Sequence, residues 1–181
     1  LKGAGEIVQD RMGGIVVRRK GGSGPRVMLD CHLDEIGFII QHVTKEGFLK
    51  FLNLGGWTGH VLGAQRVTVH GDRGTLPGII GSTPPHFLPP ERRDKALQIA
   101  DLFIDIGAGS REEAESWGVR TGSWAVPFSP FTALSGGKHY VAKAFDNRLG
   151  CALAIECTLL AKKTPNILFM AGSTQEEVGL R

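Results

Sequence analysis

Glycine and proline divide the first two-thirds of this 181-residue chain into short segments. The chain holds 26 glycines and nine prolines, and the runs between them are extended and apolar, as in a strand-rich fold. Two such runs, 7–9 and 15–19, flank Gly13-Gly14 and predict a hairpin. After a turn at 20–25, residues 26–29 predict a short buried strand.

Further extended runs follow, with tight turns between them. Four or more short strands joined in this way predict a small barrel or a sandwich. Within the same region, Ser110 and Glu113 form a capping-box pattern for a short helix that ends near Trp117, before Gly118. The extended runs are 36–43, 48–52, 66–70 and 75–80.

A longer helix is predicted over 147–163, capped by Asp146 or Asn147 and ended by Pro165. The run 166–171 is continuously apolar, as in a central parallel strand. The predicted apolar stripe of the helix consists of Leu149, Ala152, Leu153, Cys157, Leu160 and Ala161.

Together with a predicted strand over 139–145, this helix and the strand at 166–171 form a βαβ unit. The simplest architecture is therefore an α/β domain split by a β-rich insert. The α/β part takes the first thirty-odd residues and those after about residue 130.

Composition excludes several classes of protein. The 21 Lys and Arg residues exceed the 18 Asp and Glu residues by only three, and they are scattered, so we expect neither nucleic-acid binding nor a polybasic membrane anchor. The longest apolar window, 150–161, is too short to cross a bilayer. Three cysteines, Cys31, Cys151 and Cys157, predict reduced core thiols and a cytoplasmic setting. Because the chain starts without Met and stops directly after acidic residues, we expect it to be a piece of a longer protein.

Three groups of metal-type ligands follow the predicted strands of the α/β part. The first is His32 with Asp34, where an imidazole could bind a metal and a carboxylate one residue away could orient it. The second is Asp146, and the third is the pair Glu176 and Glu177. Sites in open α/β sheets lie at strand ends, and one His with several carboxylates suits divalent ions and hydrolysis. Each group taken alone is more simply a solvated loop, but three together at corresponding strand ends favour chemistry.

Other candidates carry less weight. The His70-Gly71-Asp72 segment repeats the His-x-Asp spacing but lies in a tight turn, which favours a surface hairpin. His60 and His86 fit loop or interface positions. No Ser or Cys stands in a nucleophile motif, so covalent catalysis is disfavoured.

Six segments spread along the chain carry a resemblance to a known family. They resemble, in order, the tetrahedral, self-compartmentalising metalloaminopeptidases, a family that includes glutamyl and deblocking aminopeptidases and members labelled endoglucanase. The segments are 28–38, 55–57, 77–86, 101–107, 144–151 and 174–181.

The resemblance implies two divalent metal ions, zinc or cobalt, and a peptide substrate. It implies that His32 ligates one metal, Asp146 bridges the two and Glu177 ligates the other. Glu176 would be the general base, and Asp34 would orient His32.

The resemblance also implies a zinc-exopeptidase-like α/β sandwich. Residues 1–36 and 128–181 would form part of the catalytic domain, and residues 37–127 would form an inserted β-barrel dimerisation domain whose dimers assemble into a hollow dodecamer. The two remaining ligands of the family, an Asp and a His, have no counterpart in this sequence, so we expect this chain alone to be inactive.

Three hypotheses stay open. The first is a cytoplasmic metalloaminopeptidase, and the second is a non-catalytic assembly or binding module. The third, polysaccharide hydrolysis, is the weakest, because it needs two carboxylates that flank a sugar cleft.

Overall fold

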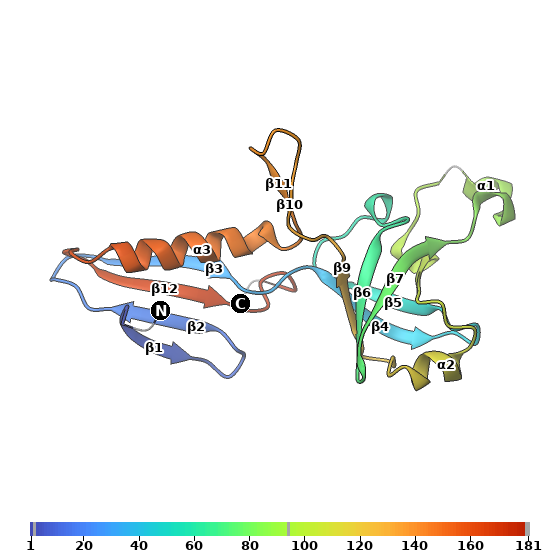
Figure 1. The fold of residues 1–181 in the computed structure, drawn as a ribbon, viewed down its shortest axis with the longest axis horizontal. Coiled ribbons are helices and arrows are strands. Elements are labelled where there is room, and N and C mark those ends of the chain that lie inside the picture. Colours follow the sequence, from blue (N-terminus) through green and yellow to red (C-terminus); the bar gives the residue numbers. More distant parts are fainter. Residues whose placement is uncertain (2, 94, 180–181) are drawn as a thin grey trace. The chain divides into compact units, whose positions relative to one another are not determined.

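The computed structural model describes residues 1, 3–93 and 95–179. The chain divides into two compact units, each with its own hydrophobic core (Figure 1). The α/β unit comprises residues 1–35 and 144–181, and the barrel unit comprises residues 36–143. The predicted combination of an α/β fold with a small β-barrel insert is confirmed.

The α/β unit contains a four-stranded sheet in the order β1–β2–β12–β3. The predicted hairpin is β1 and β2, and its turn uses Gly13 with a φ of 92°. Strand β12 lies centrally, antiparallel to β2 and parallel to β3, as its apolar sequence predicted. The bounds are β1 Glu6–Gln9, β2 Ile15–Arg19, β3 Arg26–His32 and β12 Ile167–Ser173.

Helix α3, Phe145–Leu160, packs on one face of this sheet, against β3 and β12 (Figure 1). It buries Cys151, Ala154 and Thr158, which are small enough to let the helix approach the sheet closely. The buried Thr158 hydroxyl donates to the carbonyl of Ala154 at 2.7 Å, so its polarity costs little there.

The predicted apolar stripe does not face this sheet. Leu149, Leu153 and Leu160 are 55, 57 and 73 % exposed, and Cys157 is exposed as well. The face of α3 that packs on the sheet carries smaller side chains, which allow a close approach. Of the three thiols predicted to lie in the core, only those of Cys31 and Cys151 do so.

The predicted strand at 139–145 is also wrong. Only β11, Tyr140–Val141, is extended, and it pairs with the nearby β10, Thr132–Ala133, in a local hairpin of the barrel unit. A hairpin partner a few residues away satisfies the backbone of β11, so β11 does not need the large sheet. Helix α3 already begins at Phe145. The parallel strand preceding α3 in the sheet is therefore β3, with the whole barrel unit inserted in the crossover.

Strand β3 is longer and less buried than predicted. Val27 and Met28 are 36 and 60 % exposed, because β3 is the edge strand among the described residues. Burial begins only at Cys31 and His32, where α3 covers the strand.

The barrel unit is a closed barrel in the strand order β4–β5–β8–β7–β6–β9. Its core contains the fully buried Leu49, Val69, Leu102 and Ile104, with Phe38 stacked on Trp57 at 5.1 Å between ring centroids. The barrel strands are β4 Gly37–Val43, β5 Leu49–Leu54, β6 Arg66–Gly71, β7 Gly74–Ser82, β8 Leu102–Asp105 and β9 Trp124–Pro127.

Short helices connect the barrel strands. The predicted capping pattern is confirmed in α2, Arg111–Ser116, where the Ser110 hydroxyl accepts from the Glu113 amide at 3.2 Å. Among the helices in the described residues, none has the length and hydropathy needed to span a bilayer. The other short helices are η1 Gly59–Val61, η2 Pro85–Phe87, α1 Pro90–Arg93 and η3 Ile99–Asp101.

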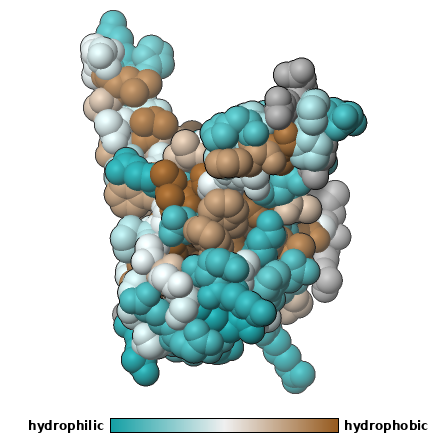
Figure 2. All heavy atoms as spheres, turned by 90° about the vertical axis from the view of Figure 1, so that its right-hand side faces the viewer, coloured by the Kyte–Doolittle hydropathy of each residue, from teal (hydrophilic) through white to brown (hydrophobic). Residues whose placement is uncertain are grey.

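Apolar side chains also remain exposed on the barrel unit. Figure 2, which faces this unit, shows apolar residues gathered between hydrophilic ones. The large apolar residues exposed on the barrel strands and their loops include Leu52, Val61, Ile79, Phe87, Trp124 and Phe128.

Candidate metal centre

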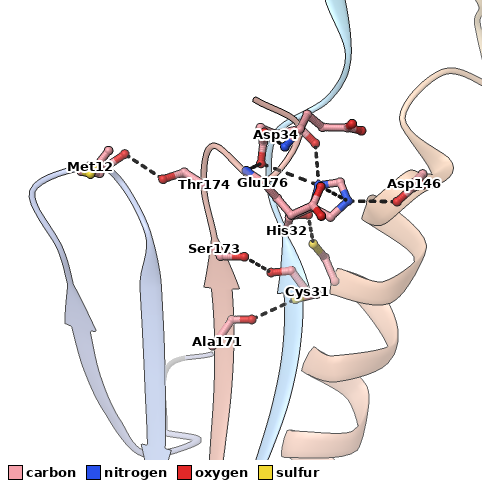
Figure 3. Close-up of polar contacts among 11 residues, drawn as sticks. Met12, Cys31, His32, Asp34, Asp146, Ala171, Ser173, Thr174 and Glu176 are labelled. Atoms are coloured by element: carbon pink, nitrogen blue, oxygen red, sulfur yellow. Dashed lines mark hydrogen bonds and ion pairs between the residues drawn. The ribbon is translucent and has the colours of Figure 1, made fainter. Parts of the chain in front are cut away.

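Three segments of the α/β unit meet at one edge of its sheet (Figure 3). Strands β3 and β12 run parallel with His32 opposite Ser173, so the segments that follow them leave the sheet side by side. The start of α3 brings Asp146 to the same place, where it contacts His32. The three ligand groups predicted from sequence therefore converge, although 114 or more residues separate His32 from Asp146 and the glutamates.

His32 is buried, with 8 % of its side chain exposed, and both ring nitrogens have partners. Nδ1 contacts the main-chain carbonyl of Asp34 at 3.2 Å, and Nε2 contacts Oδ1 of Asp146 at 2.9 Å. Both partners are acceptors, so this arrangement favours a ring that donates from both nitrogens.

The environment raises the pKa of His32 above its usual value. Burial alone would lower this pKa, but the hydrogen bonds to Asp146 and to the Asp34 carbonyl and the charges of Glu176 and Asp34 outweigh it. A cation bound at Nε2 would take the place of the second proton, while the Asp34 carbonyl would keep the first on Nδ1.

The two glutamates complete the group. Ligand atoms of His32, Glu176 and Glu177 all lie within 4.8 Å of one another, and this is the one such metal-type group in the described part of the chain. His32 Nε2 lies 3.7 Å from Oε2 of Glu176. Asp146 touches His32 but is not part of this mutual group, and its side chain is 86 % exposed.

Like charges crowd this centre. The pKa of Glu177 is raised, mainly by burial and further by the charges of Asp146, Glu176 and Asp34, while His32 opposes the shift. A divalent cation would relieve this crowding, and imidazole with carboxylate oxygens is a donor set that such ions accept. The residues present therefore fit a metal.

Asp34 contacts both halves of the centre. Its carboxylate accepts the amide N–H of Glu176 at 3.3 Å and that of Glu177 at 3.1 Å. The same carboxylate lies 3.7 Å from His32 Nδ1, which is beyond hydrogen-bond distance.

A contact from Cys151 escaped the sequence analysis. Its thiol, on α3, donates to the main-chain carbonyl of His32 at 3.1 Å, which ties the helix to the end of β3. The neighbouring Cys31 thiol contacts the carbonyl of Ala171 at 3.2 Å, and burial raises its pKa to about 12. No spacing rule could find these contacts, because they depend on how closely α3 approaches the sheet.

Asp146 or Asn147 was also expected to cap this helix. The residue before α3 is Ala144, which makes no side-chain cap, and both Asp146 and Asn147 have a non-helical backbone at a kink. The Asp146 carboxylate contacts the buried His32 ring, and such a charge-assisted hydrogen bond is among the stronger ones in proteins.

The weaker candidates lie elsewhere. His70 stacks on Trp124 with ring centroids 3.6 Å apart, and Asp72 pairs with Arg120, with a shortest contact of 2.7 Å. His60 and His86 lie in the short helices η1 and η2 of the barrel unit.

The fold and this centre define an α/β protein with a candidate metal site and an inserted β-barrel. The family model for M42 glutamyl aminopeptidases matches residues 13–181, so the chain belongs to that family.

Curated relatives agree with this assignment. The chain is 42 % identical over 177 residues to the putative aminopeptidase FrvX of Escherichia coli, covering 97 % of this chain and 49 % of that protein. It is 35 % identical over 181 residues to the lysyl aminopeptidase of Pyrococcus furiosus, covering 98 % and 51 %. The chain thus spans about half the length of the curated relatives it matches.

Solved structures show the same likeness. A TET aminopeptidase from a marine sediment Thaumarchaeota archaeon matches with a TM-score of 0.92 and 43 % identity, covering 99 % of this chain and 52 % of that one. The structure titled PhTET1-12s, a dodecamer, matches at 0.82 and 33 %, covering 98 % and 52 %. A Thermotoga maritima structure titled endoglucanase matches at 0.76 and 25 %, covering 96 % and 50 %.

Proposed function

We propose that the protein carrying this chain is a metal-dependent aminopeptidase that removes N-terminal residues from peptides. The observation that carries the proposal is the convergence of His32, Glu176 and Glu177 within 4.8 Å at the end of a parallel strand pair. Membership of the M42 family and relatives named aminopeptidases support the same activity.

The proposed ligands of two divalent ions, zinc or cobalt, are His32 for one, Glu177 for the other and Asp146 between them. Such ions, when bound, polarise the scissile carbonyl and lower the pKa of water. The Asp146 carboxylate contacts His32 and is 86 % exposed, so one of its oxygens could also bind a metal ion.

Glu176 is the proposed general base. Its side chain is 39 % exposed, so a carboxylate oxygen can accept a proton from water and later give it to the leaving amine. Glu176 Oε2 lies 3.7 Å from His32 Nε2, farther than the Asp146 oxygen at 2.9 Å. An anionic cluster of this kind would also attract the free amine of a peptide, which fits an exopeptidase.

The first test compares two neighbouring variants in the full-length protein. We expect Glu176→Gln to retain its metal and lose about 10²- to 10⁴-fold in the hydrolysis of amino-acyl chromogenic amides. We expect Glu177→Gln to lose metal, measured by elemental analysis. Glu156→Gln, an exposed glutamate on α3, is the matched control.

Chelation gives the second test. Removing the metal should abolish hydrolysis, and zinc or cobalt should restore it. Hydrolysis that survives exhaustive chelation would overturn the proposal.

We further propose that residues 37–127, which hold the closed barrel, form a dimerisation domain and that dimers assemble into a dodecamer. Residues 1–36 and 128–181 would belong to the catalytic domain, although 128–143 form part of the compact barrel unit. The exposed apolar residues of the barrel unit and the dodecameric title of one structural neighbour support this. Light scattering measures the assembly, and a monomer at all concentrations would contradict it. The three free cysteines fit the cytoplasmic location that we propose.

Two other functions remain as outcomes of these tests. An assembly module would form the same particle without stoichiometric metal. A glycan hydrolase, suggested by the endoglucanase title of one neighbour, would cleave a cellulose-type substrate in parallel assays. The pairing of the carboxylates with a histidine favours the metallopeptidase over a sugar cleft.

A further inference from the structure

The segment that carries both glutamates has an unusual backbone. Gln175, the residue before Glu176, has a φ of 64°, in the left-handed region that residues other than glycine seldom occupy. Such a conformation persists only where neighbouring contacts hold it. Strand β12 ends at Ser173, so its ladder does not hold this segment.

Asp34 supplies that contact, as Figure 3 shows for its bond to Glu176. Each carboxylate oxygen receives one amide, Oδ1 that of Glu176 at 3.3 Å and Oδ2 that of Glu177 at 3.1 Å. Only 24 % of the Asp34 side chain is exposed, so water competes weakly for these oxygens. Hydrogen bonds from amides to a carboxylate are among the stronger ones in proteins.

The main chain of Asp34 acts on the other half of the centre. Its carbonyl accepts from His32 Nδ1 at 3.2 Å, whereas its carboxylate is 3.7 Å from that nitrogen. A side-chain substitution at this position therefore leaves the group that orients His32 in place.

We propose that Asp34 is a positioning residue for the Glu176–Glu177 peptide, in addition to the ion pair that its carboxylate forms with the His32 ring. The consequence for catalysis rests on the proposed function, because it requires Glu176 and Glu177 to be base and ligand. The positioning itself does not depend on any activity.

The test uses nuclear magnetic resonance of the 181-residue chain. In Asp34→Asn the amide group keeps one oxygen, so one of the two backbone bonds is lost. We expect hydrogen exchange at the Glu176 or Glu177 amide to become about tenfold faster, as for loss of a hydrogen bond to a charged acceptor. Asp30→Asn, an exposed aspartate on the same strand, should leave this exchange unchanged.

Unchanged exchange would overturn the proposal. If both amides of Asp34→Asn exchange as in the wild type, the Asp34 carboxylate does not hold this peptide. If the variant fails to fold, a measurement on the wild-type chain tests the same hydrogen bonds. Scalar couplings across the hydrogen bonds, from the Glu176 and Glu177 amide nitrogens to the Asp34 carboxyl carbon, are expected, and their absence contradicts the proposal.

Kinetics of the full-length protein provide the functional measurement. We expect Asp34→Asn to lower kcat more than it raises KM, because the proposed base is displaced, and Asp34→Glu to recover part of the loss. A wild type without peptidase activity would refute the proposed function, and the amide measurements would still decide the role of Asp34.

Discussion

The closed barrel predicts that two leucines on one strand differ sharply in how much they contribute to the free energy of unfolding. Leu49 and Leu52 both lie on β5, but Leu49 is fully buried in the barrel core and Leu52 is 50 % exposed. Leu49→Ala removes about three methylene equivalents, worth about 2.4 kcal/mol in transfer free energy. The cavity left in a rigid barrel raises the expected loss to about 3–5 kcal/mol. Leu52→Ala leaves no enclosed cavity and should cost about 1 kcal/mol.

Tryptophan fluorescence during denaturation with guanidinium chloride measures this difference. All three tryptophans, Trp57, Trp117 and Trp124, belong to the barrel unit, so the signal reports the unfolding of that unit. Leu49→Ala should lower the transition midpoint markedly with an unchanged slope, which indicates a change in stability alone. Equal losses for the two variants, or a loss below about 1 kcal/mol for Leu49→Ala, would refute the packing described for the barrel.

Two further predictions concern the barrel unit. Gly59→Ala would place a Cβ against the main-chain carbonyl of Leu97, whereas Gly63→Ala would enter open space, so thermal melts should show a lower melting temperature for the first variant only. The second concerns pH: the hydrogen bond from Arg120 holds the pKa of Asp72 below its usual value. Because the folded pKa is lower than the unfolded one, the pair stabilises the fold above the unfolded pKa, and this is lost as the pH falls through the folded pKa. Arg120→Ala should therefore return the pKa of Asp72 to its ordinary range, as a carboxyl-carbon titration would show; an unchanged titration would contradict the pairing.

Local features of this protein were readable from its sequence. The β1–β2 hairpin followed from Gly13-Gly14, and the start of α2 followed from Ser110 and Glu113. These features depend on backbone conformations and hydrogen bonds within a few residues, which a short stretch of sequence specifies. The ends of β3 and β12, which carry ligand groups, were also predicted from local sequence, because each strand is marked by its own apolar run.

Errors arose where two segments compete for one partner. Residues 139–145 were expected to join the large sheet, but Tyr140 and Val141 pair with β10, which is closer in the sequence. In α3 the leucines were expected to face inward, but the smaller side chains of Ala154 and Thr158 allow a closer approach to the sheet. Hydrophobic periodicity describes a single segment and carries no information about the surface against which that segment packs.

The sequence by itself determined the types of chemical group and the ends of the strands that carry them. Only the tertiary structure decided which atoms meet: Asp146 with the His32 ring, and the Asp34 carboxylate with two amides more than 140 residues away. The physical reason is that local conformational preferences act over a few residues. Contacts between distant segments depend on the parallel register of β3 and β12 and on the packing of α3 against them, which form only when the whole unit folds.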